Sequence, residues 1–129
     1  EIVAVAYDEN GNEIGRDSLK TADSKTVLSL LPESDSVQKD RLLYVRLSFT
    51  DENGIWKPME KHRVKLAVEG GNLAAYGNAC PYNPDGYLKD ETFTYYGESL
   101  AIIRAGEGDE VKITATYEDG STVLIVPVV

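Results

Sequence analysis

The chain has 129 residues, and its hydrophobic (42%) and charged (27%) fractions are typical of one soluble globular domain. It carries 13 basic and 22 acidic residues, a formal net charge of −9, with no local cluster of Lys or Arg. Because this charge repels phosphate groups, we expect neither nucleic acid nor an acidic membrane surface as a partner. No apolar run approaches the roughly 20 residues of a transmembrane helix. The sequence starts without Met or a signal peptide, which predicts a fragment of a longer polypeptide.

Taken in chain order, the predicted elements are all β-strands. Apolar and polar side chains alternate most clearly in three segments, which places one set on a core face and the other in water. This alternation is typical of antiparallel sheets with one covered face. The expected strands cover residues 2–7, 13–19, 26–31, 43–49, 64–68, 100–104, 111–117 and 122–128.

The stretch Val-Leu-Ile-Val-Pro-Val-Val, at residues 123–129, is apolar at both odd and even positions. We therefore expect a strand covered on both faces, with Pro127 near a sheet edge or at the end of the strand. No window shows a helical stripe with caps. Short strands separated by Gly, Pro, Asn and Asp predict an all-β fold, an immunoglobulin-like antiparallel β-sandwich.

The sequence Asp-Glu-Asn-Gly occurs twice, at residues 8–11 and 51–54, and a shorter Glu-Asp-Gly occurs at residues 118–120. An EF-hand calcium loop needs its Gly at position six, whereas here Gly arrives at position four. Asn-Gly and Asp-Gly supply the positive φ that tight hairpin turns need, so we interpret all three as turns. A surface calcium ion bridging two loops is the alternative, although these residues do not require it.

Each full copy of this motif lies inside a strand–turn–strand unit, which suggests that two structural units share the chain. We predict that residues 1–22 form a terminal hairpin or a remnant of a preceding immunoglobulin-like domain. Residues 23–129 are then a C-terminal immunoglobulin-like β-sandwich, with residues 24–40 as its first strand and a polar loop.

No arrangement of residues predicts catalysis, a cofactor or a metal centre. His62 is the only His, and we expect it to be exposed at the edge of a strand. One His supports neither a metal cluster nor an evident catalytic triad. Two of the 22 acidic residues could form a glycosidase pair, but no spacing selects one. The single cysteine, Cys80, excludes an internal disulfide, and we expect a packed or half-exposed thiol.

Aromatic residues form a separate group of candidates. Trp56 follows the second Asp-Glu-Asn-Gly turn, and five Tyr lie within residues 76–96. Because aromatic rings stack on the apolar faces of sugars, one hypothesis is a carbohydrate-binding surface. The other is packing at the sandwich edge or against another domain. The candidate contact residues are Trp56, Tyr76, Asn78, Tyr82, Tyr87, Tyr95 and Tyr96.

Several ordered motifs carry a family resemblance. They are a Val-x-Gly-Gly-x-Leu motif, a Gly-Asn-Ala-Cys-Pro motif and a Tyr-Gly-x-x-Leu-Ala-Ile-Ile-Arg motif, at residues 68–73, 77–81 and 96–104. Looser matches lie at residues 45–58 and 108–115. Together they resemble the C-terminal immunoglobulin-like domain of bacterial family 2 glycoside hydrolases of the β-galactosidase type. Residues 1–22 resemble the final hairpin of the domain that precedes it.

This resemblance implies a noncatalytic accessory domain of a β-galactosidase-type glycoside hydrolase. In that family the acid and the nucleophile lie on a barrel upstream of these residues, so no catalytic residue is assigned here. The implied partners are the upstream catalytic and β-sandwich domains of the parent chain. The implied location is bacterial, in the periplasm or secreted with the parent enzyme. Residues 76–96 are the best candidates for a contact loop.

Two other functions stay open. One is a carbohydrate-binding module that uses Trp56 with Tyr82 or Tyr87. The other is an adhesin-type immunoglobulin-like repeat without a ligand of its own. An exposed apolar patch would favour the accessory domain. Coplanar exposed rings would favour sugar binding, and an adhesin repeat would show neither feature.

Overall fold

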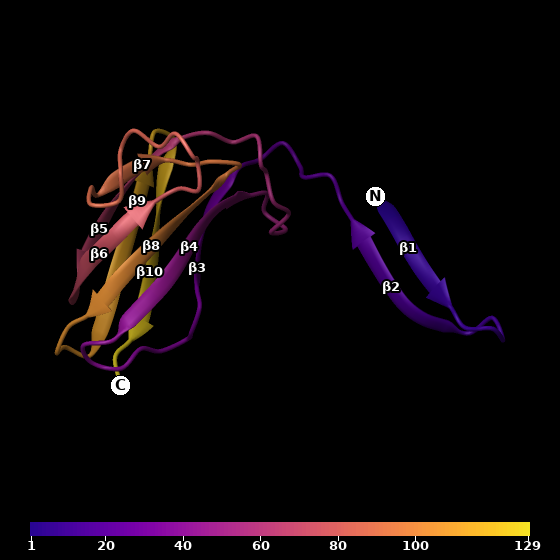
Figure 1. Ribbon diagram of the computed structural model, residues 1–129, viewed down its shortest axis with the longest axis horizontal. Coiled ribbons are helices and arrows are strands. Elements are labelled where there is room, and N and C mark those ends of the chain that lie inside the picture. The colour runs from indigo at the N-terminus through magenta and orange to yellow at the C-terminus, as the bar shows by residue number, and fades with distance from the viewer.

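The computed structural model describes residues 1–129 and contains a β-hairpin and a separate β-sandwich (Figure 1). The hairpin consists of β1 (Ile2–Tyr7) and β2 (Glu13–Leu19), and residues 20–26 link it to the sandwich. There is no helix, and hence none long and apolar enough to cross a membrane. The sandwich strands are β3 (Val27–Pro32), β4 (Leu42–Thr50), β5 (Arg63–Glu69), β6 (Gly71–Gly77), β7 (Glu91–Phe93), β8 (Glu98–Ala105), β9 (Glu110–Tyr117) and β10 (Gly120–Pro127).

The sandwich has two four-stranded sheets, one in the order β3-β4-β8-β6 and the other in the order β10-β9-β5-β7. Every pair of neighbouring strands is antiparallel. The predicted all-β, immunoglobulin-like sandwich is therefore confirmed. The segment predicted to hold the first sandwich strand and a polar loop, residues 24–40, contains β3 and all but the last residue of the loop that follows it.

The core lies between the two sheets and follows the predicted alternation. On β4, Leu43, Val45, Leu47 and Phe49 are each at most 1% exposed, whereas Tyr44 and Arg46 face outward. The opposite sheet contributes the alternate residues of β5 and β9 to the same cluster of 17 buried hydrophobic side chains. Period-two patterning thus placed the core correctly wherever it was clear.

The prediction for the last strand was half wrong. β10 pairs only with β9 and is an edge strand, with Pro127 as its last residue, as expected. It is not covered on both faces, because Val123 and Ile125 are each 52% exposed on the outer side. Apolar residues at both parities therefore did not mean burial on both faces here.

Two strands, β6 and β7, were not predicted, and the loop expected at residues 76–96 is shorter than expected. Residues 76 and 77 end β6, residues 91–93 form β7, and the loop is divided into residues 78–90 and a short connection at residues 94–97. The register of β6 shifts between Leu73 and Ala75, which breaks its period of two. β7 has three residues and is too short to show a period.

The turn interpretation of both Asp-Glu-Asn-Gly motifs is confirmed, and the two share one geometry. Asp8 Oδ1 accepts the backbone N–H groups of Asn10 and Asn12 at 2.9 and 2.8 Å. Asp51 Oδ1 accepts those of residues 53 and 55, both at 2.9 Å. The glycines have φ of 83° and 80°. The third motif also turns, between β9 and β10, but without the positive φ that we expected at its Gly.

Candidate functional site: a groove on the outer face of one sheet

The outward face of the β3-β4-β8-β6 sheet is unusually apolar. Tyr44 on β4, Leu100 and Ile102 on β8, and Ala75 on β6 follow one another across the strands, since Tyr44 pairs with Ile102 and Ile102 with Ala75. Leu100 is 44% exposed. Water therefore meets a continuous apolar surface in the middle of this sheet, which is typical of an interaction surface.

Two adjoining hollows cross this face, with volumes of about 510 and 410 Å³. They share Arg46 and Glu98, whose side chains form a long ion pair at 3.8 Å between β4 and β8. The larger hollow runs over Leu100 and Ile102 to the 78–90 loop. The smaller one reaches Leu31 and Trp56. We call the two hollows together the outer groove.

Three aromatic residues at one end of the groove, Trp56, Tyr95 and Tyr96, form what we call the aromatic tip. Tyr95 and Glu98 exchange backbone hydrogen bonds across a two-residue turn, in which Tyr96 has φ of 50° and Gly97 has φ of 74°. Two positive φ values define a type I′ turn, and for a bulky residue such as Tyr this conformation is strained.

The chain holds this turn in place from the side of Trp56. Its indole Nε1–H donates to the carbonyl oxygen of Tyr96 at 2.9 Å. A Cβ at Gly97 would lie 2.5 Å from the carbonyl oxygen of Lys57, so only glycine fits there. The indole and the turn therefore fix each other, and Trp56 and Tyr96 stay 48% and 59% exposed.

The Tyr95 and Tyr96 rings do not form a flat platform. Tyr95 and Tyr96 have ring centroids 4.7 Å apart and an interplanar angle of 78°, an edge-to-face contact. Coplanar exposed rings were the feature expected of a carbohydrate-binding module. The platform that we expected was Trp56 with Tyr82 or Tyr87, and the angle between Tyr95 and Tyr96 concerns neither of these pairs.

Two of the seven predicted contact residues, Tyr76 and Asn78, are buried. Tyr76 is 1% exposed, and its hydroxyl is bonded to Val64 O (3.3 Å) and Ser99 Oγ (3.2 Å). Burial raises the pKa of Tyr76 to about 12. The Asn78 amide donates to Thr92 and Phe93. Both residues hold the loop mainly from inside, although they also line part of the larger hollow, because the unpredicted strand β6 carries Tyr76 into the core and ends just before Asn78.

The other predicted residues divide between the groove and open solvent. Tyr87 lines the larger hollow and packs over Gly77, where a Cβ would collide with the Tyr87 ring. Tyr82 is 90% exposed on the loop and does not line the groove. The structure therefore brings together four of the predicted residues, Trp56, Tyr87, Tyr95 and Tyr96.

Sequence reasoning missed the groove floor. Arg46, Leu100 and Ile102 were seen only as outward members of alternating strands or were left unassigned. The sequence Leu-Ala-Ile-Ile at residues 100–103 could have indicated this floor, because it is apolar at both odd and even positions, like the last strand. On β8, the second apolar set forms the floor of the groove.

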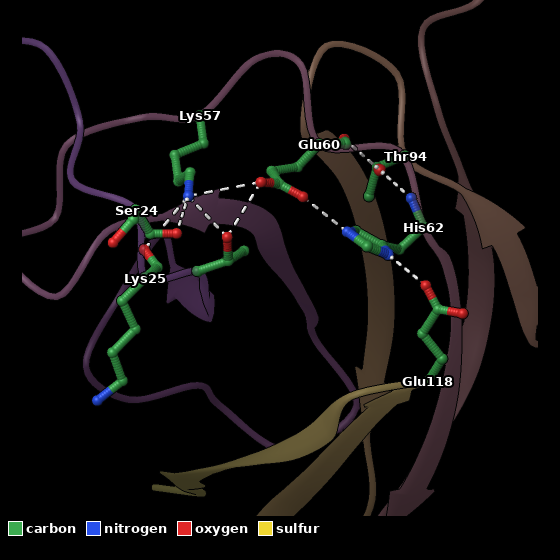
Figure 2. Close-up of polar contacts among 8 residues, drawn as sticks. Ser24, Lys25, Lys57, Glu60, His62, Thr94 and Glu118 are labelled. Atoms are coloured by element: carbon green, nitrogen blue, oxygen red, sulfur yellow. Dashed lines mark hydrogen bonds and ion pairs between the residues drawn. The ribbon is translucent and has the colours of Figure 1, made fainter.

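The expectation of an exposed His62 at a strand edge was wrong. Its side chain is only 15% exposed, and its two ring nitrogens lie 2.8 Å from Glu60 Oε2 and 3.1 Å from Glu118 Oε1 (Figure 2). The residue precedes β5, and its ring packs into the end of the sandwich beside Phe49. No group of three or more His, Cys, Asp or Glu side chains is arranged to hold a metal ion.

A sequence profile described as glycoside hydrolase family 2 C-terminal domain 5 matches residues 28–125. No curated protein matches the chain. A glycosyl hydrolase family 2 member from Bacteroides cellulosilyticus superposes with a TM-score of 0.89 and 22% identity, over 98% of this chain and 17% of that one.

Two further solved structures are similar. A β-glycosidase from Bacteroides vulgatus has a TM-score of 0.83 and 18% identity, over 97% of this chain and 17% of its own. A β-glucuronidase from glycoside hydrolase family 2 has a TM-score of 0.79 and 13% identity, over 98% of this chain and 14% of its own. At these identities the superpositions show a shared fold. The chain spans less than a fifth of the length of these enzymes.

Proposed function

The chain belongs to the family of glycoside hydrolase family 2 C-terminal domains of type 5, and from this we infer that it is a noncatalytic accessory domain of a glycoside hydrolase. We propose that its outer groove and aromatic tip pack against other domains of the parent chain. The parent enzyme would hydrolyse β-glycosidic bonds. A β-galactosidase is one member of that class, and the enzymes with similar structures support only the class.

The single observation that carries this proposal is the difference between the two outer faces. The outward face of the β10-β9-β5-β7 sheet bears charged pairs such as Glu69–Lys112 and Lys65–Asp90, as a solvent-facing sheet does. The outward face of the other sheet bears Tyr44, Leu100 and Ile102. Arg46 and Glu98 also pair on the groove face, and Val123 and Ile125 are exposed on the edge strand of the other sheet, so the contrast concerns the middle strands: Leu100 and Ile102 on β8 against Lys65 on β5 and Lys112 on β9. This apolar middle supports the groove face as the docking face.

The contacts of linker residues 23–25 support the proposal that the partner of the groove is an upstream domain. Asp23 N–H donates to Asp51 Oδ2 at 2.9 Å, and Lys57 Nζ donates to the carbonyl oxygens of Ser24 and Lys25 at 3.0 and 3.3 Å. Lys57 directly follows Trp56 in the sequence. Residues that lead back into the preceding part of the chain are therefore attached beside the aromatic tip, and a domain on that side would meet the groove first.

We further propose that residues 1–22 belong structurally to a preceding domain. Every residue of β2 is exposed, including Ile14 (69%) and Leu19 (73%), and Ile2 on β1 is 73% exposed. A two-stranded hairpin is marginally stable on its own in water. Its apolar side chains and unpaired strand edges would be covered if the hairpin completed an upstream sheet.

A pair of matched substitutions tests the docking proposal in the full-length parent enzyme. Leu100→Glu puts a charge on the groove floor, and Val123→Glu puts one at a similarly exposed position on the other sheet. We expect Leu100→Glu to speed protease cleavage in residues 20–26 of the parent at least about tenfold, because losing roughly 1.4 kcal/mol of interface contact changes an equilibrium tenfold.

Val123→Glu should leave the cleavage rate of the parent unchanged, and the isolated 129-residue chain should show no difference between the two variants. Equal cleavage rates for both variants in the parent would overturn the docking proposal. A faster rate for Leu100→Glu in the isolated chain as well would mean that the substitution acts within the sandwich itself.

Carbohydrate binding is a second candidate because Trp56 and Tyr96 are exposed next to each other. Affinity gel retardation of the 129-residue chain on galactose-containing and plant polysaccharides, with Trp56→Ala as the control, tests whether the chain binds carbohydrate. Retardation that the substitution abolishes would establish a binding module. The apolar groove weighs against an adhesin-type repeat, and the bacterial, periplasmic or secreted location of the parent stays a prediction.

A further inference from the structure

The His62 ring occupies a position that favours its charged form. It packs against Phe49 (centroids 4.8 Å apart) and Tyr117 (5.4 Å), at the end of the sandwich where the linker attaches. One ring nitrogen faces Glu60 and the other faces Glu118 (Figure 2). An imidazolium donates from both nitrogens, whereas a neutral imidazole has only one N–H. Only the protonated ring can hold both carboxylates.

Glu60 continues this contact toward the linker. Its Oε1 accepts the Thr26 hydroxyl at 3.0 Å and lies 3.5 Å from Lys57 Nζ. Lys57 Nζ donates in turn to Thr26 Oγ1 at 2.7 Å and to the carbonyl oxygens of Ser24 and Lys25. The Lys57 side chain is 14% exposed, so it cannot turn to solvent without breaking these contacts. Figure 2 shows the continuous series of polar contacts from the linker to Glu118.

We propose that His62 is a proton-operated clamp that ties the β9–β10 turn to the Lys57–Glu60 segment and thereby fixes the linker that leads to the hairpin. When His62 loses its proton, one carboxylate loses its donor. Glu118 is 75% exposed and swings into water at little cost. Glu60 then keeps Lys57 as its only charged partner, and Lys57 is drawn away from the linker carbonyls. This goes beyond the proposed function, because it holds for any parent protein.

The surrounding charges agree with this direction. On its own segment His62 faces Glu60, with Lys57 behind it, and the β9–β10 turn supplies Glu118. β9 supplies the Tyr117 ring, and β4 supplies only Phe49, which has no charge. After β7, Thr94 Oγ1 accepts the His62 backbone N–H. The neighbouring cations Lys61 and Arg63 lie over the Phe93 ring instead.

The pKa shifts follow from these contacts. Burial works to lower the pKa of His62, but the hydrogen bonds and charges of Glu60 and Glu118 outweigh it and raise the pKa above 6.5. The hydrogen bond from His62 holds the pKa of Glu60 below its ordinary value of 4.5, against the effect of its own burial. The clamp is therefore fully formed from above pH 4.5 to below pH 6.5, and it opens as the pH rises through the folded-state pKa of His62.

NMR titration of the 129-residue chain between pH 5 and pH 9 tests the clamp. The imidazole nitrogen shifts report the protonation of His62, and 15N relaxation of residues 23–26 reports the motion of the linker. We expect the His62 pKa to lie above 6.5 and linker motion to increase with the same midpoint. Glu118→Gln should lower the His62 pKa, because it removes one of the two carboxylates that favour the imidazolium.

Glu52→Gln is the matched control. Glu52 pairs with Lys25 of the linker but does not contact His62, so its substitution should leave the His62 pKa unchanged. A His62 pKa at or below 6.5 in the unsubstituted chain would overturn the proposal, whatever the variants do. A raised pKa without any change in linker motion would overturn it as well, because the charged ring would then serve local stability alone.

Discussion

The two Asp-Glu-Asn-Gly turns have the same sequence and the same backbone geometry, and they lie in regions of opposite character. In each, the first Asp accepts the backbone N–H groups two and four residues later, and the Gly has φ near 80°. The turn at Asp8 closes an exposed hairpin, whereas the turn at Asp51 closes the end of β4 in the sandwich. The local sequence therefore specifies the turn without help from its surroundings.

What differs is the number of distant contacts. Asp51 is 2% exposed, and its second oxygen accepts the backbone N–H of Asp23 at 2.9 Å, so it also anchors the linker. Asp8 bonds only within its own turn, where Asn12 supplies the largest effect in lowering its pKa. For Asp51 the amide of Asp23 has that role. The same motif thus makes only local hydrogen bonds in the hairpin, whereas in the sandwich it also makes a tertiary contact with the linker.

The largest expected contrast between the regions is in hydrogen exchange. Amides of β1 and β2 should exchange at nearly unprotected rates in the 129-residue chain, because an isolated hairpin opens readily. Amides of the central strands β4 and β8 should be protected at least ~1,000-fold, as expected for exchange through global unfolding. Protection of β1 and β2 equal to that of β4 would break the comparison, and protection that appears only in the parent enzyme would sharpen it.

Substituting the two aspartates should give the next largest effect. Asp51→Ala removes a buried carboxylate and leaves three partly buried backbone N–H groups without their acceptor, so we expect the Tm of the sandwich to fall by about 10 °C or more. Asp8→Ala should leave that Tm unchanged, because its contacts end within the hairpin. Unfolding followed by Trp56 fluorescence measures both. Equal effects would mean that the hairpin and the sandwich unfold together.

Much of the fold could be predicted because it depends on local pattern. The alternation at residues 43–49 identified β4 and its core face, since one side chain in two has to be apolar when one face of a sheet is buried. The Asp-Glu-Asn-Gly motifs predicted their turns, because the Asp oxygens and the positive φ of Gly act within five residues. The edge position of β10 followed from Pro127, which has no N–H to donate.

What could not be predicted depends on residues far apart in the sequence. His62 lies 56 positions before Glu118, and nothing near either residue predicts that they meet. Tyr76 appeared to be one of five similar Tyr residues, and only the continuation of β6 turns its ring into the core. The apolar outer face of the sheet needs the register of three strands to bring Tyr44, Ile102 and Ala75 side by side. These features belong to sheet pairing, which one strand's pattern does not specify.

The smallest expected effect isolates backbone strain from packing. Gly11 and Gly54 have nearly equal positive φ, and a Cβ at either position meets no atom within 4 Å. Alanine therefore adds only the cost of a left-handed conformation, about 1 kcal/mol at each site. Gly54→Ala should lower the Tm of the sandwich by about 4–8 °C, whereas Gly11→Ala should not change it. Differential scanning calorimetry of the two variants makes the comparison. Because the two glycines have the same backbone conformation and the same free space, alanine adds the same strain at both. A difference in Tm therefore measures how strongly each turn is coupled to the unfolding of the sandwich. Equal decreases would show that the hairpin unfolds together with the sandwich.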